Sequence, residues 1–172
     1  LRFLSWFRVN FFYPDARILQ YKNLIQFLTR FIDENNINTI ISSSPPHSIH
    51  KIVLKLKKIR SFKWILDFRD PYLNWDILLS MNPNFISKWI HSSFQRSFLK
   101  TSDNIVVTNS NLKKEFSKVI NKHKIELIHN GSNIIPSSYK SKKFIISYFG
   151  LINKFRDPKV FIDVIDELIA EN

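Results

Sequence analysis

Two patterns of apolar and polar residues alternate along the chain. In the first, apolar residues recur every three or four positions, which places them on one face of a helix. It predicts helices over residues 16–35, 47–60, 83–100 and 112–120. The second is a short run rich in β-branched and aromatic residues, which is typical of a strand. It predicts strands over residues 38–43, 62–68, 103–108 and 124–129.

The regular alternation of strand and helix indicates βαβ units. Right-handed crossovers between such units produce a parallel sheet with helices packed against it. We therefore expect an α/β fold, a doubly wound Rossmann-like sheet with helices on both faces, over residues 1–131. Ligands of these sheets bind beyond the carboxyl ends of the strands, so the site is expected in the loops after them. Those loops begin at Ser42, Asp67, Thr108 and Asn130.

Local signals predict where two helices begin and where the first domain ends. Ser44-Pro45-Pro46 predicts a cap with proline in the first helical turn, and Asp157-Pro158 predicts a second helix start. Residues 132–143, rich in serine and lysine, predict an interdomain linker. Beyond it, residues 144–172 are expected to be the first strand, 144–149, and the first helix of a second Rossmann-like domain, with both chain ends as cuts. The face of that helix expected to be buried holds Val160, Phe161, Val164, Ile165, Leu168 and Ile169.

Composition narrows the class of protein. The 172 residues are 44% apolar, enough for a packed core, and no apolar run approaches the roughly 18 residues that a membrane-spanning helix needs. The chain has no cysteine, which excludes disulfides and thiolate metal sites and favours a reducing, cytoplasmic compartment. No set of His, Asp and Glu has metal-ligand spacing, so we expect no metal and no cofactor.

The net charge of +12 is concentrated in the first domain. Residues 1–143 hold 23 Lys or Arg against 9 Asp or Glu, whereas residues 144–172 hold 3 against 5. A basic stripe on the helix over residues 47–60 is either a solvated face or a contact with an anionic membrane surface. The aromatic and arginine-rich residues 1–13 are either an interfacial segment, peripheral at the inner membrane face, or ordinary core. The stripe consists of Lys51, Lys55, Lys57, Lys58, Arg60 and Lys63.

Four segments, read in order, resemble the family 4 glycosyltransferases of the GT-B fold, which have two facing Rossmann-like domains. The Ser-Pro-Pro-His-Ser and Asp-Phe-Arg-Asp-Pro pair is the most specific part of the resemblance. The segments are Ile41–Ser48, Trp64–Pro71, Ile128–Ser132 and Ile146–Gly150, the last followed by Arg156-Asp157-Pro158. The resemblance implies a retaining transfer from a nucleotide-sugar donor, which is a co-substrate, to the hydroxyl of a sugar or lipid-linked acceptor, in polysaccharide or glycolipid synthesis.

The resemblance also implies roles for the residues at matching positions. Asp70 and Arg69 would be catalytic, at a position where many relatives have histidine. Substrate binding would fall to Ser44, His47, Asp67 and Asn130. Gly150 and Arg156 would bind the donor phosphates, although Leu151 stands where relatives often have a basic residue. The family's paired glutamates would lie beyond Asn172, so we expect residues 1–172 alone to be inactive.

Simpler interpretations of these residues stay open. Two carboxylates and a guanidinium at a strand end are suited to bind sugar hydroxyls, but they are also a local ion pair. The helix start at residues 42–48 offers free N–H groups to a ligand, yet a histidine such as His47 is more often a packing or capping residue. Asn130-Gly131 alone is a common turn. A basic nucleic-acid-binding module, or a noncatalytic interaction domain, ranks lower because no nucleic-acid reader motif is present.

Overall fold

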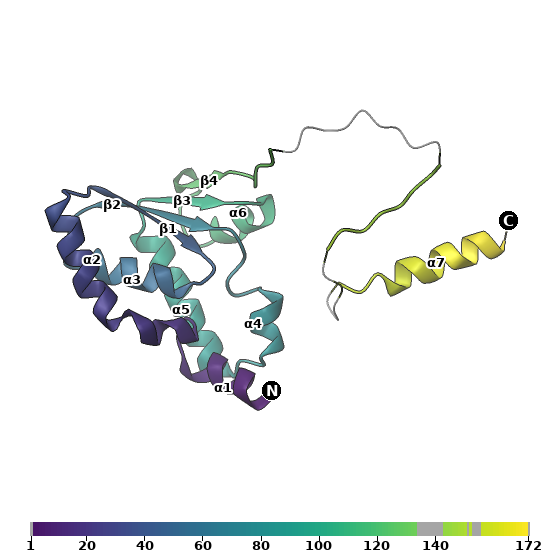
Figure 1. The fold of residues 1–172 in the computed structure, drawn as a ribbon, viewed down its shortest axis with the longest axis horizontal. Helices are drawn as coiled ribbons and strands as arrows, with labels where there is room; N and C mark the ends of the chain where they lie inside the picture. The colour runs from purple at the N-terminus through teal and green to yellow at the C-terminus, as the bar shows by residue number, and fades with distance from the viewer. Residues whose placement is uncertain (1, 134–142, 151, 153–155, 172) are drawn as a thin grey trace. The chain divides into compact units, whose positions relative to one another are not determined.

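The computed structural model describes residues 2–133, 143–150, 152 and 156–171. They separate into one unit over residues 1–131 and another over residues 132–172. The first unit ends at Gly131 (Figure 1). The elements of the first unit are α1 (Arg2–Phe11), η1 (Ala16–Tyr21), α2 (Lys22–Glu34), β1 (Thr39–Ser44), α3 (Ser48–Leu56), β2 (Lys63–Phe68), α4 (Asp76–Ser80), α5 (Phe85–Thr101), β3 (Asn104–Val107), α6 (Ser110–Phe116), η2 (Lys122–Lys124) and β4 (Ile125–Leu127).

The four strands form one parallel sheet in the order β1-β2-β3-β4, as the alternation of strands and helices predicted. The register pairs Ser44 with Phe68 and Phe68 with Val107, so the strands end at nearly the same edge. The last pair of strands joins Val107 to Leu127. This edge is therefore where the loops after β1 to β4 meet.

Helices cover only one face of this sheet among the described residues. Along β2, Trp64, Leu66 and Phe68 are buried, whereas Lys63 is exposed and Ile65 and Asp67 are half-buried. Figure 1 shows α2, α3 and α5 on one side of the sheet. The prediction of helices on both faces is thus not met here. The reason is topological, because right-handed crossovers that all step in the same direction place their helices on the same face.

The core lies between the covered face of the sheet and helices α3, α5 and α6. It is rich in aromatic side chains: the ring centroids of Phe68 and Phe116 are 5.0 Å apart in an edge-to-face arrangement. Burial of such large apolar side chains is the main source of stability for the unit. The fully buried side chains include Trp64, Phe68, Phe98, Leu99, Ile105, Val107 and Phe116.

One polar group in this core is Ser42 of β1, which faces the helices between apolar neighbours. Its hydroxyl accepts a hydrogen bond from the Trp64 indole at 2.7 Å and lies 2.8 Å from Nδ1 of His50 on α3. A buried polar group without a partner is costly, so this three-membered contact fixes how α3 sits on β1 and β2.

The start of α3 differs from the prediction. Ser44 is the last residue of β1, and α3 begins at Ser48 after the cap residue His47, which makes no capping hydrogen bond. The carboxylate of Asp15 instead accepts from the Ser48 N–H at 2.7 Å. A residue 33 positions away thus supplies the oxygen that a local cap would provide at a helix N-terminus.

The second unit shows one regular element, α7 (Lys159–Ala170), among its described residues. The Lys159 N–H donates to the Asp157 side chain at 3.0 Å, so the predicted helix start is confirmed. Residues 144–149, predicted to be a strand, have no regular secondary structure, and the expected buried face of α7 is exposed or half-buried. The reason is physical: strands and amphipathic helices need a partner surface, and the described residues of this unit supply none. Most of the predicted linker, residues 134–142, lies outside the described residues.

Candidate functional site

Arg69 ties the strand ends together at the carboxyl edge of the sheet. Its N–H donates to the Ser44 carbonyl at 3.1 Å, and its own carbonyl accepts from the Thr108 hydroxyl at 2.9 Å. Its guanidinium donates to the side-chain oxygen of Asn130. The structure therefore brings the predicted residues Arg69, Ser44 and Asn130 into one hydrogen-bonded group that spans the loops after all four strands.

Asp67 points away from that group. It lies on the sheet face without helices, where it accepts a hydrogen bond from the Ser43 hydroxyl at 2.7 Å. Asp70, the other predicted carboxylate, is half-buried and makes no hydrogen bond with any described residue. Ser44 is buried against the helix layer, and its hydroxyl is without a partner there. The predicted site residues thus fall on both sides of the sheet and not in one cluster.

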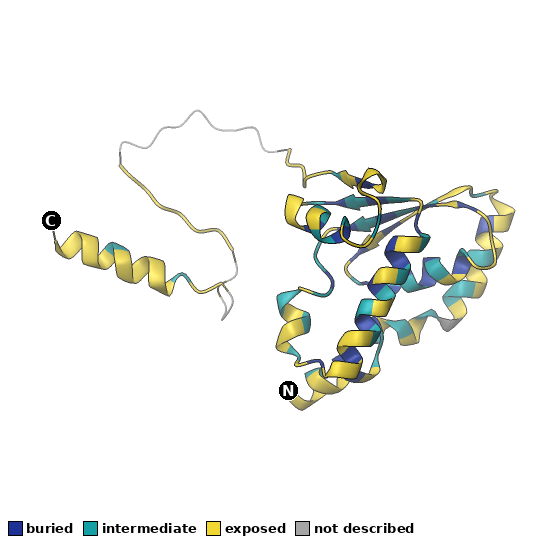
Figure 2. Ribbon diagram, turned by 180° about the vertical axis from the view of Figure 1, so that it is seen from behind, coloured by how far each residue is buried: buried dark blue, intermediate teal, exposed yellow. Residues whose placement is uncertain are grey.

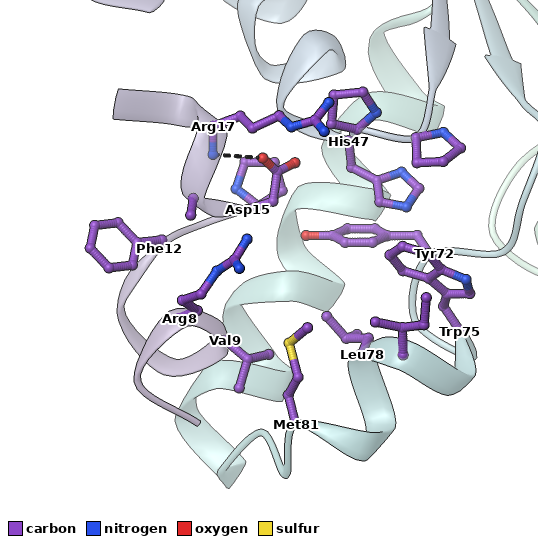
Figure 3. A pocket seen from close by; sticks show the side chains of 15 residues that line it. Arg8, Val9, Phe12, Asp15, Arg17, His47, Tyr72, Trp75, Leu78 and Met81 are labelled. Atoms are coloured by element: carbon purple, nitrogen blue, oxygen red, sulfur yellow. Dashed lines mark hydrogen bonds between the residues drawn. The ribbon is translucent and has the colours of Figure 1, made fainter. Parts of the chain in front are cut away.

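A pocket of about 370 Å³ lies beside this edge, beyond the carboxyl ends of β1 and β2. The loop after β1 contributes Pro45 to His47, and the segment after β2 contributes Tyr72 and Trp75 (Figure 3). Sheets of this kind bind ligands at such a position. Its other walls come from α1, the turn into η1, and α4: Arg8, Val9, Phe12, Pro14, Asp15, Ala16, Arg17, Ile77, Leu78 and Met81.

His47 is the one predicted site residue that lines the pocket. Its ring centroid is 4.3 Å from that of Tyr72 and 6.1 Å from that of Trp75, and its side chain is only 3% exposed. Burial lowers the pKa of His47 to about 4, partly opposed by the negative charge of Asp15 and reinforced by His91. The imidazole is therefore neutral near pH 7, and neither ring nitrogen has a hydrogen-bond partner among the described residues.

A hydrogen-bond chain fixes the Tyr72 ring beneath His47. Nε2 of His91 lies 3.1 Å from the Val9 carbonyl, which can only accept, so that nitrogen carries a proton. In the neutral ring Nδ1 is then an acceptor, and the Tyr72 hydroxyl donates to it at 2.6 Å. Burial lowers the pKa of His91 and raises the pKa of Tyr72, which keeps both groups neutral. Tyr72 is 1% exposed, so this chain holds its ring in place as a buried part of the pocket wall.

Charged groups of both signs lie at the opposite wall of the pocket. Asp15 accepts from the N–H groups of Ser48 and Arg17, at 2.7 and 3.0 Å. Figure 3 shows Arg8 and Asp15 on the side toward which the Tyr72 hydroxyl points, with Arg17 next to Asp15. The pocket thus combines an aromatic wall with a carboxylate and two guanidinium groups, an arrangement that can hold a small polar ligand with one apolar face.

The pattern of residues along the chain did not point to most of this pocket. Tyr72 directly follows the Asp-Phe-Arg-Asp-Pro segment, and Trp75 lies three residues further on. The position of that segment could therefore have pointed to both residues. Arg8, Asp15 and Arg17 precede the first strand and carry no such signal, because only the fold brings them to the loop after β1.

The donor-side residues lie in the other unit. A Cβ added at Gly150 would lie 2.9 Å from the Tyr148 hydroxyl, the far end of a flexible side chain, and Arg156 is exposed. Their predicted roles toward donor phosphates stay predictions. No group of three His, Asp or Glu side chains that could hold a metal occurs among the described residues.

Three of the six residues in the basic stripe on and after α3 are engaged within the protein. Lys51 donates to the Tyr13 carbonyl at 2.8 Å, Lys57 pairs with Asp103 at 2.6 Å, and Arg60 pairs with Asp33 at 2.5 Å. Lys55 and Lys58 are exposed. The solvated-face interpretation therefore fits this helix better than a continuous contact surface does.

Comparison of the chain with protein-family models, with curated proteins and with solved structures finds no match. Of the helices that the structure describes, none is long and apolar enough to cross a membrane. The assignment of a function therefore depends on the pocket, the fold and the sequence motifs.

Proposed function

We propose that residues 1–131 are the acceptor-binding domain of a nucleotide-sugar-dependent glycosyltransferase of the GT-B type. The transfer would carry a sugar to a hydroxyl acceptor with retention of configuration. The observation that carries the proposal is the pocket beyond β1 and β2, lined by His47, Tyr72 and Trp75 and by three charged side chains. The parallel sheet and the order of the four motif segments also support it.

The pocket suits a sugar because it offers two different kinds of wall. A pyranose ring has an apolar face of C–H groups, which can pack on the half-buried aromatic ring of Trp75. Its hydroxyls can donate to Asp15 and accept from Arg8 and Arg17, since charge-assisted hydrogen bonds are the stronger ones. A volume of about 370 Å³ lies within the range of small-ligand pockets.

Neutral His47 would form part of the pocket wall and would not remove a proton from the acceptor. A base with a pKa of about 4 is too weak to take a proton efficiently near neutral pH. Both ring nitrogens are buried, so the contribution of His47 is the packing of its ring beside Tyr72 and Trp75.

The remaining roles belong to the same proposal. Asp70 is half-buried without a described partner, which leaves its carboxylate available to a reacting hydroxyl, whereas Arg69 positions Asn130 at the strand edge. Gly150 and Arg156 would approach the donor diphosphate, where a basic residue offsets charge on the leaving group. A doubly wound sheet, with helices on both faces, would require additional strands beside the edge strand β1. The lack of cysteine supports a reducing compartment.

Saturation-transfer NMR with common monosaccharides and disaccharides tests acceptor binding. We expect transfer from the protein to at least one sugar, lost in Trp75→Leu and in His47→Leu. Trp89→Leu is the matched control, because Trp89 is 65% exposed on α5 and does not line this pocket. The proposal fails if no sugar receives saturation, or if the Trp75 and Trp89 variants behave alike.

A further inference from the structure

Helix α1 presents a row of large apolar side chains to solvent. Phe3, Leu4 and Phe11 are 71%, 61% and 58% exposed, although they belong to a well-formed helix. The two phenylalanine rings pack on neighbouring rings of the same helix: the Phe7 and Phe11 centroids are 4.7 Å apart, and those of Phe3 and Trp6 are 6.2 Å apart. A contiguous exposed aromatic surface of this kind marks a contact with a partner.

The outer face of α5 continues this chemistry. Phe85, Ile86 and Trp89, in its first two turns, are among the most exposed side chains of the domain. Further along the same helix, Trp89, Arg96 and Lys100 line a shallow groove. In Figure 2 the helix at the N mark and the long helix above it both turn exposed surface to the viewer.

The two helices are joined by hydrogen bonds, so their exposed side chains keep a fixed relative position. The Val9 carbonyl of α1 accepts from the Ser87 hydroxyl at 2.8 Å and contacts the His91 ring. The Asn10 side chain accepts from the Asn84 N–H at 2.9 Å. Val9 and Asn10 are the buried residues of α1, and the rest of the helix is exposed or half-buried. A partner would therefore bind without ordering these segments first.

The charge on this surface has one sign. Residues 1–14 and 77–102 contain no aspartate or glutamate. They contain five exposed basic residues, Arg2, Arg8, Lys88, Arg96 and Lys100. An apolar surface with only cationic residues around it is complementary to a partner that has anionic groups at its surface and an apolar layer below them.

We propose that α1 and the outer face of α5, together the interfacial face, dock on the surface of an anionic lipid bilayer. Short helices with aromatic residues on one side and Lys or Arg beside them lie in the headgroup region in this way. Nucleic acid would satisfy the cations and stack on the aromatic rings, but it gains nothing from aliphatic side chains such as Leu4 and Ile86. A bilayer can accommodate the cationic, the aromatic and the aliphatic side chains.

The interfacial face is next to the pocket, because the pocket wall includes Arg8 and Val9 of α1 and also Phe12, the residue that follows α1. A docked domain would hold the pocket mouth close to the headgroups. The inference does not depend on the proposed function, since lipid binding is measured without any sugar, and sugar binding without any lipid.

Flotation of the whole chain with vesicles tests the docking. We expect it to float with phosphatidylcholine vesicles that contain phosphatidylglycerol, far more than with phosphatidylcholine alone. Phe3→Ser/Phe7→Ser should weaken binding at least about tenfold, because the apolar contact is lost. Lys88→Gln/Arg96→Gln should weaken it roughly fivefold per charge, and only on the anionic vesicles.

The matched control is Phe27→Ser/Phe31→Ser on α2. These rings are also exposed and stacked, with centroids 6.0 Å apart, but they lie outside the interfacial face, so binding should be unchanged. Circular dichroism checks that every variant is folded. If the α1 variant unfolds, the vesicle binding of Lys88→Gln/Arg96→Gln is used to test the inference. The inference is overturned if the chain does not float, if neutral and anionic vesicles bind equally, or if the α2 control loses binding to the same extent. Tight binding of RNA in a filter assay without vesicle binding would also overturn it.

Discussion

Acid should destabilise the first unit through His47, and the size of the effect follows from its burial. The pKa of His47 is about 4 in the folded protein, against about 6.5 in an unfolded chain. Because the folded value is the lower one, the stabilising contribution is present above about pH 6.5. It is lost as the pH falls toward about 4, where the unfolded chain binds a proton that the folded protein does not.

The magnitude follows from the difference between the two pKa values. The difference between a pKa of about 6.5 in the unfolded chain and about 4 in the folded protein corresponds to roughly 3 kcal/mol over the whole range. Between about pH 7 and about pH 5, the free energy of unfolding should fall by about 2 kcal/mol through this residue alone. The substitution His47→Phe keeps an aromatic ring against Tyr72 and removes the titration. Its free energy of unfolding should therefore depend less on pH than that of the wild type, by that amount.

Urea unfolding at both pH values, followed by near-ultraviolet circular dichroism of buried Trp64, measures the difference. Burial also lowers the pKa of His50 and of His91, but both titrate in both proteins and largely cancel in the comparison. Histidine NMR gives an independent reading, because the imidazole signal that is missing from His47→Phe should titrate at about pH 4 in the wild type. Equal pH dependence in the wild type and His47→Phe would refute the reasoning that His47 is buried as a neutral side chain.

Three further substitutions test the packing of the domain by urea unfolding. Asp15→Ala should cost about 1–3 kcal/mol, because the Ser48 N–H loses its acceptor and the α3 N-terminus loses a nearby negative charge, and an unchanged midpoint would rule out this long-range cap. Phe68→Ala should cost roughly 3–5 kcal/mol, because it empties a fully buried site between the sheet and α6; a loss below about 1 kcal/mol would contradict that packing. Asn84→Ala should cost about 1 kcal/mol by removing the oxygen that accepts from the Ser87 N–H at the start of α5, whereas Asn84→Asp should retain most of the stability.

The elements with a strong local pattern could be predicted from the sequence. The run of apolar and aromatic residues from Phe62 to Phe68 predicted β2, and the parallel pairing followed from strand-helix alternation. The strand order could not be read in this way. After each crossover the next strand can lie on either side of the previous one in the sheet. Whether helices cover one face of the sheet or both is therefore known only when the order of all four strands is known.

The site was predicted in part, and the reason lies in the distances along the chain. His47 was identified because it belongs to the Ser-Pro-Pro-His-Ser segment of the family resemblance. Asp15 was missed because its contact with Ser48 joins positions 33 residues apart, and no local periodicity reports such a contact. Residues 144–149 show the opposite failure: an apolar run predicts a strand, but a strand exists only when a neighbouring strand accepts its hydrogen bonds.

Amide chemical-shift mapping with a bound saccharide tests directly whether the pocket beside His47 binds a sugar acceptor. Binding should shift the resonances of the Trp75 indole and of the backbone amides of Arg17, His47 and Tyr72, which line the pocket. The resonance of the Trp89 indole, on the outer face of α5, should not shift. Shifts confined to the α5 face, or no shift with any sugar tried, would contradict acceptor binding in this pocket.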